Sequence, residues 1–280
     1  MSRKGRPGVP PLDPAKGGAL GTRLVLAAVL ALAGIPAARA ADPDALWKIV
    51  DGRCVPGAQT RHDPAPCVSV DAASGTALLK DRVGRTQFLL IPTTKITGIE
   101  SPAILAPDAP NYFARAWDAT RLVDQRAGHD LPRRDFALAI NSERGRSQNQ
   151  LHIHIDCIRP DIRAILDRLD PRIGPRWQAL PRRLALHRYR ALRIDGDTLG
   201  DTNPFRLLAA SLPDPATDMG RHTLVLVGDE RHGHPGFILL DGQSGPLTVT
   251  LTAADITRLK IGPGSGEELE DHACRIAGGS

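Results

Sequence analysis

Short stretches of apolar or alternating residues recur along the chain, and a few stretches have the 3.6-residue spacing of helices. The apolar and alternating stretches predict strands at residues 77–79, 87–91, 136–140, 151–158, 186–194, 222–227, 237–240 and 247–251. Helical spacing and helix-start residues predict helices near 44–50, 108–128, 162–169 and 267–274, and one that begins at Asn203-Pro204. Residues 51–66 and 97–107 are expected to be loops, because Pro and Gly interrupt them. This order predicts an α+β fold with a largely antiparallel sheet, flanking helices and two halves of similar layout.

The longest apolar run lies near the N-terminus, directly after a basic stretch. Residues 24–35 are apolar or Gly, and Ala38-Arg39-Ala40 places small residues at the spacing that a signal peptidase accepts. Residues 1–40 are therefore predicted to be a signal peptide or, if uncleaved, an N-terminal anchor in the inner membrane. We expect residues 41–280 to form an exported, periplasmic domain, with the site in residues 41–170 and a second half in residues 171–280.

Charge and composition narrow the class of protein further. The chain of 280 residues carries 36 Lys and Arg against 31 Asp and Glu, a formal net charge of +5. Six of the basic residues and one of the acidic residues lie within residues 1–40, which leaves 30 of each in the remainder. A nucleic-acid partner is not expected, because the predicted domain has no basic excess to bind phosphates through its overall field.

Four cysteines fit an oxidising compartment. Three pairings are possible. We favour Cys54 with Cys67, which are close in sequence and bracket a Pro-rich stretch, and Cys157 with Cys274, which would tie a strand to the C-terminal tail. No C-x-x-C pair is present, so the sequence gives no support to a zinc ribbon or a thioredoxin-like site.

The stretch from Asn141 to Ile155 carries the most specific chemical signal. Strand alternation places His152, His154 and Asp156 on one face, after a loop that contains Gly145 and Ser147. A neutral imidazole can attack phosphorus, while loop amides, a hydroxyl and arginines stabilise the charge that grows on the phosphoryl oxygens. An H-x-H pair alone is more often a polar strand face, and a zinc site with Asp156 as third ligand is a minor alternative.

The same stretch resembles the histidine triad superfamily, in which a strand of alternating histidines follows a Gly-x-Ser phosphate loop. The chain from residue 41 onward is similar to the CDP-diacylglycerol pyrophosphatase family of the bacterial envelope. The segments that carry this resemblance are Leu46-Trp47, Arg53-Cys54, 63–67, 77–81, 98–102, 145–149, 152–155, 157–161 and Asp271-His272 with Cys274. The resemblance implies hydrolysis of CDP-diacylglycerol to CMP and phosphatidate through a nucleotidyl-histidine, with a membrane surface nearby.

The resemblance also implies roles for individual residues. A triad of Gln150, His152 and His154 makes His152 the nucleophile, whereas a triad of His152, His154 and Asp156 makes it His154. We favour His152, because Ser147 then stands five residues before the nucleophile, as it does in the superfamily. The predicted catalytic residues are thus His152 and His154, and the predicted phosphate-binding residues are Asn141, Arg144, Arg146, Ser147 and Gln150.

Two other functions remain open from the sequence. One is hydrolysis of soluble nucleotide pyrophosphates, or nucleotidyl transfer to another acceptor, by the same chemistry. The other is a periplasmic ligand-binding protein in which the histidine face only binds. The arrangement requires no metal or other cofactor, and the sequence does not indicate an oligomeric state. The H-x-H spacing of His232 and His234 falls in a predicted turn, and we expect no function there.

Overall fold

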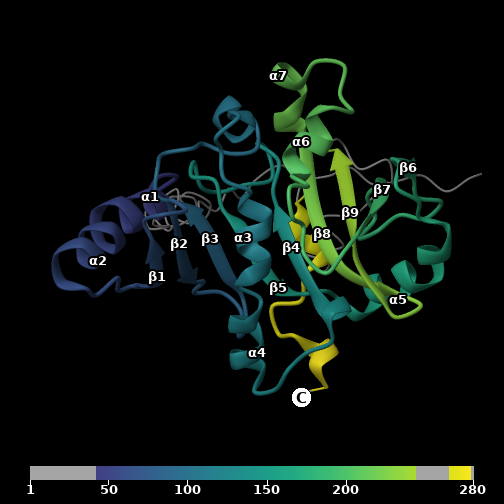
Figure 1. Cartoon of the computed structure of the whole chain (residues 1–280), viewed down its shortest axis with the longest axis horizontal. Coiled ribbons are helices and arrows are strands. Elements are labelled where there is room, and N and C mark those ends of the chain that lie inside the picture. The colour runs from purple at the N-terminus through teal and green to yellow at the C-terminus, as the bar shows by residue number, and fades with distance from the viewer. Residues whose placement is uncertain (1–41, 244–264, 279–280) are drawn as a thin grey trace, which may run out of the picture. The chain divides into compact units, whose positions relative to one another are not determined.

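Nine strands form one antiparallel sheet (Figure 1) in a computed structural model that describes residues 42–243 and 265–278. The strands are β1 (Cys67–Asp71), β2 (Thr76–Lys80), β3 (Phe88–Pro92), β4 (Phe136–Ile140), β5 (Ile153–Cys157), β6 (Gln178–Ala179), β7 (Tyr189–Asp195), β8 (His222–Arg231) and β9 (His234–Gln243). Their order across the sheet is β1-β2-β3-β5-β4-β8-β9-β7-β6. The α+β fold with a largely antiparallel sheet is therefore confirmed. Because β4 pairs with β8, the sheet continues across the two predicted halves.

The described residues also contain seven α-helices, most of them short. They are α1 (Ala45–Ile49), α2 (Val55–Arg61), α3 (Tyr112–Asp118), α4 (Arg121–Ala127), α5 (Pro160–Leu169), α6 (Pro204–Ala209) and α7 (Pro215–Asp218). Shorter turns are the π-helical η1 (Val50–Cys54) and the 3₁₀ turns η2 (Pro102–Leu105), η3 (Arg133–Asp135), η4 (Asp170–Arg172), η5 (Met219–Arg221), η6 (Gly266–Leu269) and η7 (Arg275–Ala277). No helix in this described part is long and apolar enough to cross a membrane. The predicted leader, residues 1–40, and the predicted strand 247–251 lie outside the described residues.

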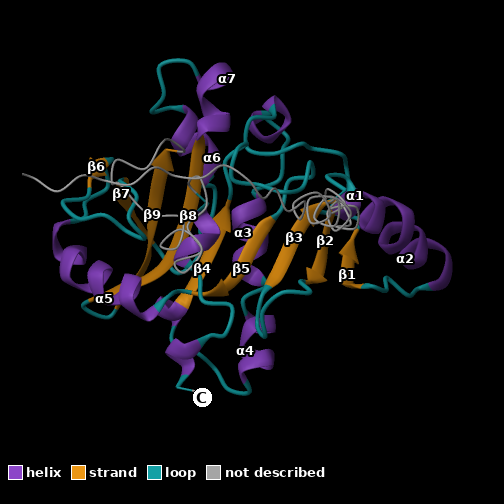
Figure 2. Cartoon of the chain, turned by 180° about the vertical axis from the view of Figure 1, so that it is seen from behind, coloured by secondary structure: helices purple, strands orange, loops and turns teal. Residues whose placement is uncertain are grey.

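Side-chain alternation divides the core between the two faces of the sheet. Ile153 and Ile155 of β5 belong to the largest apolar cluster, which includes Phe113 of α3. Figures 1 and 2 show α3 on this face, in front of the strands in one view and behind them in the other. His154 points to the opposite face, because its register partners are Leu89 of β3 and Ala139 of β4.

That opposite face is covered by two separate groups of elements. The α1–η1–α2 segment packs on β1, β2 and β3 through a cluster that contains Val50 and Leu89. Helix α5 and η6 pack on β4, β8 and β9 through a cluster that contains Leu166 and Leu269. His154 lies on β5, which is the strand between these two apolar clusters. Strand β5 and the residue before it thus carry a row of polar side chains between the two apolar clusters. We call this row, which consists of His152, His154 and Asp156, the polar strip.

Both favoured disulfides are confirmed. Cys54 is bonded to Cys67, with Cα atoms 5.6 Å apart, and Cys157 is bonded to Cys274, with Cα atoms 5.2 Å apart. The first bond joins the end of η1 to β1. The second joins β5 to the C-terminal segment, residues 265–278, and so fixes that segment beside the strand of the histidines.

The prediction that residues 51–66 form a loop is wrong. The helix that begins at Ala45 continues through η1 and α2 to Arg61. Pro56 stands in the first turn of α2, directly after η1, so the continuous helix lacks the one hydrogen bond that its N–H would have donated. Val50 and Cys54 are fully buried against the sheet, so tertiary packing outweighs the low helix propensity of Pro and Gly.

Two helix predictions are also corrected. The stretch 108–128 is not one helix, because α3 ends at Asp118 and α4 begins at Arg121. Its predicted stop is confirmed, since Gly128 caps α4 at a φ of +89°. Residues 267–274 do not form an α-helix: the 3₁₀ turn η6 ends at Leu269, and η7 begins only at Arg275. Backbone hydrogen bonds to Cys157 and Arg159 and the Cys157–Cys274 disulfide hold the segment against the sheet.

Candidate active site

Strand β5 and the residue before it bring two imidazoles into contact. The ring centroids of His152 and His154 are 4.9 Å apart and the rings meet edge to face. Both residues are buried, with 8% of His152 and 4% of His154 exposed. The predicted catalytic pair is thus in place on one polar strip, and its two members differ in their hydrogen bonds.

The hydrogen bonding of His152 specifies its tautomer. Its Nδ1 lies 2.7 Å from the carbonyl oxygen of Gln150, which can only accept, so Nδ1 carries the proton. The lone pair of a neutral His152 then resides on Nε2. Burial, followed by the neighbouring His154, lowers the pKa of His152 to about 4. His152 is therefore a neutral imidazole at neutral pH, with no proton on its Nε2.

His154 has the complementary arrangement. The side-chain amide nitrogen of Gln87 lies 2.5 Å from its Nδ1 and donates to it, which places the proton of His154 on Nε2. That Nε2 is buried and 3.6 Å from Oε2 of Glu267, beyond hydrogen-bonding distance. Within the described residues it has no hydrogen-bond acceptor. His154 therefore presents an unbonded N–H donor, on a ring whose centroid is 4.9 Å from that of His152.

The C-terminal segment adds charged groups that the sequence analysis did not assign to the site. Nε2 of His272 lies 3.4 Å from Oε1 of Glu267, and its Nδ1 lies 2.9 Å from Oδ2 of Asp156. Thr86 donates to the other oxygen of Asp156 at 2.6 Å. The predicted Cys157–Cys274 bond was the sequence signal that could have placed these acidic and basic residues beside β5.

Three of the predicted phosphate-binding residues make hydrogen bonds or ion pairs with other segments of the protein. Gln150 is buried, and its amide nitrogen donates to the carbonyl oxygens of Pro92 and Thr94. Asn141 accepts from Ser265 Oγ at 2.9 Å and donates to Glu267 Oε2 at 3.3 Å. Arg146 pairs with Glu100 at 2.7 Å, and its guanidinium packs on Gly98, where a Cβ would lie 2.6 Å from Nη1. Phosphate binding by Gln150, Asn141 and Arg146 therefore remains a prediction.

The other two predicted phosphate-binding residues are exposed on the loop between β4 and β5. Arg144 and Ser147 lie in this loop, which hydrogen bonds tie to the start of α1. Gln148 accepts from the N–H of Leu46 at 2.8 Å, and the N–H of Asn149 donates to Pro43 at 2.6 Å. The loop is thus held at the end of the polar strip by the first helix.

Asp156 is the residue on which the zinc alternative depended. Its carboxylate accepts hydrogen bonds from Thr86, His272 and the backbone N–H of Cys157. In the residues that the structure covers, no group of three or more His, Cys, Asp or Glu side chains is arranged to hold a metal ion. Asp156 therefore serves as a partner of His272 in this arrangement.

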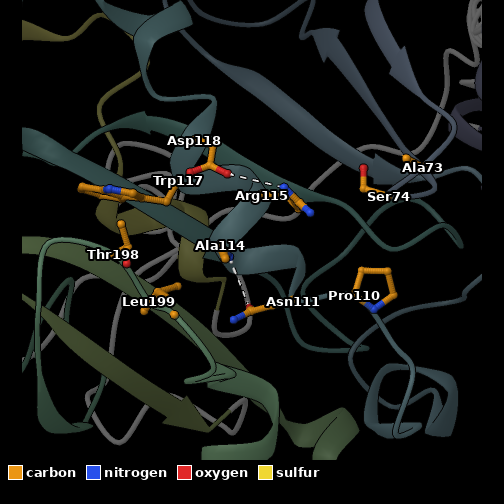
Figure 3. A pocket seen from close by; sticks show the side chains of 11 residues that line it. Ala73, Ser74, Pro110, Asn111, Ala114, Arg115, Trp117, Asp118, Thr198 and Leu199 are labelled. Carbon is orange, nitrogen blue, oxygen red and sulfur yellow. Dashed lines mark hydrogen bonds and ion pairs between the residues drawn. The ribbon is translucent and has the colours of Figure 1, made fainter.

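A separate cavity of about 490 Å³ lies beside α3 (Figure 3). Ser74, Asn111 and Trp117 line it, together with Arg115 and Asp118, whose side chains lie 3.9 Å apart on the same helix. None of the residues of the histidine site lines this cavity. The two sites are therefore built from different parts of the fold.

Sequence comparisons agree with this geometry. Residues 41–278 match the family described as CDP-diacylglycerol pyrophosphatase. The chain belongs to the CDP-diacylglycerol pyrophosphatase family. A CDP-diacylglycerol pyrophosphatase of Yersinia pestis is 38% identical to it over 257 residues, which cover 90% of this chain and 92% of the relative. The resemblance to the CDP-diacylglycerol pyrophosphatase family is thus confirmed, and the protein is a hydrolase of that family.

Proposed function

We propose that the protein hydrolyses CDP-diacylglycerol to CMP and phosphatidate in phospholipid metabolism, with His152 as the nucleophile. The family and the name of the Yersinia pestis relative support this substrate. The observation that carries the residue assignment is the bond from Nδ1 of His152 to the carbonyl of Gln150, because it leaves the lone pair on Nε2. His154 lacks this arrangement, since Gln87 contacts its Nδ1.

The proposed reaction has two steps. His152 Nε2 attacks the phosphorus of the cytidylyl group, a P–N bond forms, and the P–O bond to phosphatidate breaks, so phosphatidate leaves with the bridging oxygen. Water then attacks the same phosphorus and loses a proton. The P–N bond breaks, its electron pair returns to Nε2, and CMP leaves with the oxygen of water. This order would place the chain among histidine triad-like enzymes.

The remaining groups would stabilise charge on the phosphates. In this proposal the Nε2–H of His154 donates to an oxygen of the transferred phosphoryl group, where its buried position strengthens the bond. Ser147 and the loop amides would bind the same group, and Arg144 would meet the second phosphate from the exposed loop. The enzyme would act on the periplasmic side of the membrane, close to the lipid surface.

Release of CMP from CDP-diacylglycerol by the purified full-length chain tests the proposal. His152→Ala should lower kcat more than about 1,000-fold, and His154→Ala about 100- to 1,000-fold. His234→Ala is the matched control, because this exposed histidine has the same H-x-H spacing and is the first residue of β9, directly after the β8–β9 turn. CMP release that survives His152→Ala contradicts the nucleophile assignment. Faster turnover of a soluble CDP-linked pyrophosphate would instead favour the soluble-substrate alternative.

A further inference from the structure

The C-terminal segment, residues 265–278, is attached to the end of β5 and to the residues that directly follow it. The N–H of Asp271 donates to the carbonyl of Cys157 at 2.8 Å, and the N–H of Arg159 donates to Leu269 at 3.0 Å. The Cys157–Cys274 disulfide adds a covalent bond at the end of the same strand. The position of this segment is therefore set by the strand that carries the histidines.

The attachment creates a row of alternating bases and acids on the polar strip. His154 is followed by Glu267 at 3.6 Å, Glu267 by His272 at 3.4 Å, and His272 by Asp156 at 2.9 Å. Asp156 is fully buried and is held by Thr86. The row therefore runs from the N–H of His154, which has no hydrogen bond, to the carboxylate of Asp156, which Thr86 holds in place.

Each charged group in this row favours the charged form of its neighbour. Burial opposes a charge on His272, but Asp156 and Glu267 outweigh it and raise the pKa of His272 to about 10, so it is an imidazolium. Burial also opposes a charge on Glu267, but His154 and His272 outweigh it and lower the pKa of this carboxyl below its usual range. Glu270, the other acid near His272, has a pKa raised by burial and by Asp156, which favours its neutral form. The row thus consists of two carboxylates, one imidazolium and His154.

Glu267 is held from a second side as well. Asn141, at the end of β4, donates to its Oε2 at 3.3 Å and accepts from its backbone N–H at 3.3 Å. The side chain of Glu267 is still 31% exposed, so it borders the open part of the strip. The negative charge of a carboxylate held 3.6 Å from His154 Nε2 favours the tautomer that carries its proton on that atom.

We infer that Glu267 and His272 are positioning residues of this active site: His272 holds the Glu267 carboxylate in place, and the charge of Glu267 acts together with the Gln87 hydrogen bond to keep the proton of His154 on Nε2 for the transferred phosphoryl group. This inference rests on the proposed function, in which His154 donates to that group. Glu267 and His272 do not contact the reacting phosphorus in this role. Their effect falls on the chemical step, because they determine how His154 meets the transition state rather than how the nucleotide binds.

Kinetics of three variants of the full-length protein test the inference. Glu267→Gln keeps the shape of the side chain and removes its charge, and His272→Gln removes the imidazolium. We expect each to lower kcat for CMP release roughly 10- to 100-fold, with KM changed less than about threefold. Arg275→Gln is the matched control on the same segment, since this side chain is 70% exposed and pairs only with Asp271 among the described residues. It should retain the wild-type kcat.

The dependence of kcat on pH separates positioning from a loss of folding. Three acids face His272, namely Asp156 on β5 and Glu267 and Glu270 on its own segment. Glu267→Gln removes one of the carboxylates that raise the pKa of His272, so the alkaline loss of activity should move to lower pH. Glu267→Asp, which keeps the charge, should restore the wild-type alkaline limb and part of kcat even if Glu267→Gln is poorly folded.

Two outcomes would overturn the inference. One is a wild-type kcat in Glu267→Gln, and the other is an alkaline limb that is the same in wild type, Glu267→Gln and Glu267→Asp. Failure of the proposed function gives a different result, namely undiminished CMP release by His152→Ala. The two failures are therefore distinguishable in one set of assays.

Discussion

The charge of His272 should make the stability of this protein depend on pH. Its pKa is about 10 in the folded protein, because Asp156 and Glu267 outweigh the effect of burial, against 6.5 for an ordinary histidine. A histidine whose pKa is raised by folding contributes stability that is fully present below about pH 6.5 and is lost as the pH rises through about 10. The free energy of unfolding should therefore fall across this range.

The size of this contribution follows from the pKa difference and the surroundings. At about 1.4 kcal/mol for each pKa unit, the difference corresponds to at most ~5 kcal/mol. The side chain of His272 is 25% exposed, so solvent screening reduces this figure, and we expect ~2–3 kcal/mol. When His272 loses its proton, the fully buried carboxylate of Asp156 loses its positively charged partner. This destabilises the folded state and leaves the unfolded state unchanged.

Urea unfolding of wild type and His272→Gln between about pH 6.5 and pH 10.5 measures the contribution. Wild type should be more stable than the variant by ~2–3 kcal/mol at the acidic end, and the difference should approach zero at the alkaline end. Arg275→Gln controls for the loss of an ion pair on the same segment and should show a difference that is independent of pH. A constant difference between wild type and His272→Gln across the range would refute the assignment of charge to His272.

Further predictions concern the same segment and are measured by thermal unfolding and CMP release. Gly84→Ala should destabilise the protein by ~1–3 kcal/mol and lower activity, because Gly84 has a φ of +74° and an added Cβ would lie 2.6 Å from Cβ of His272. Wild-type stability in this variant would contradict the contact. Glu270→Gln should change stability by less than ~1 kcal/mol at neutral pH, because burial raises the pKa of Glu270 and favours its neutral form; a large loss would mean that it is charged. The double variant Cys157→Ala with Cys274→Ala should lose activity at temperatures at which its circular dichroism remains that of a folded protein, and equal loss of both signals would contradict local detachment of the segment.

Local patterns were enough to predict most of the strands and the histidine pair. Ile153 and Ile155 alternate with His154 and Asp156, and a period of two specifies which side chains share a face. Gly84, Gly128 and Pro204 mark the turn, the helix end and the helix start at which the structure has them. These features depend on neighbours in sequence, which is why the sequence alone predicts them.

Contacts between distant segments account for what the sequence did not predict. Gln87 lies 67 residues from His154 and has no motif that marks it as a partner of the imidazole. Glu267 stands in a segment that appeared helical, but its position is determined by Asn141 and by the disulfide to β5. The sequence also did not predict that residues 51–61 are helical, because the burial of Val50 and Cys54 that stabilises this helix is a property of the assembled fold.

The central claim is that the cytidylyl group is transferred to Nε2 of His152 before water releases it. Rapid quenching of the full-length protein with CDP-diacylglycerol, followed by mass analysis of its peptides, tests this claim most directly. The account predicts that the peptide with His152 gains one cytidylyl group during turnover and that His152→Ala gains none. A cytidylyl group found on His154, or CMP formed at an undiminished rate by His152→Ala, would contradict it.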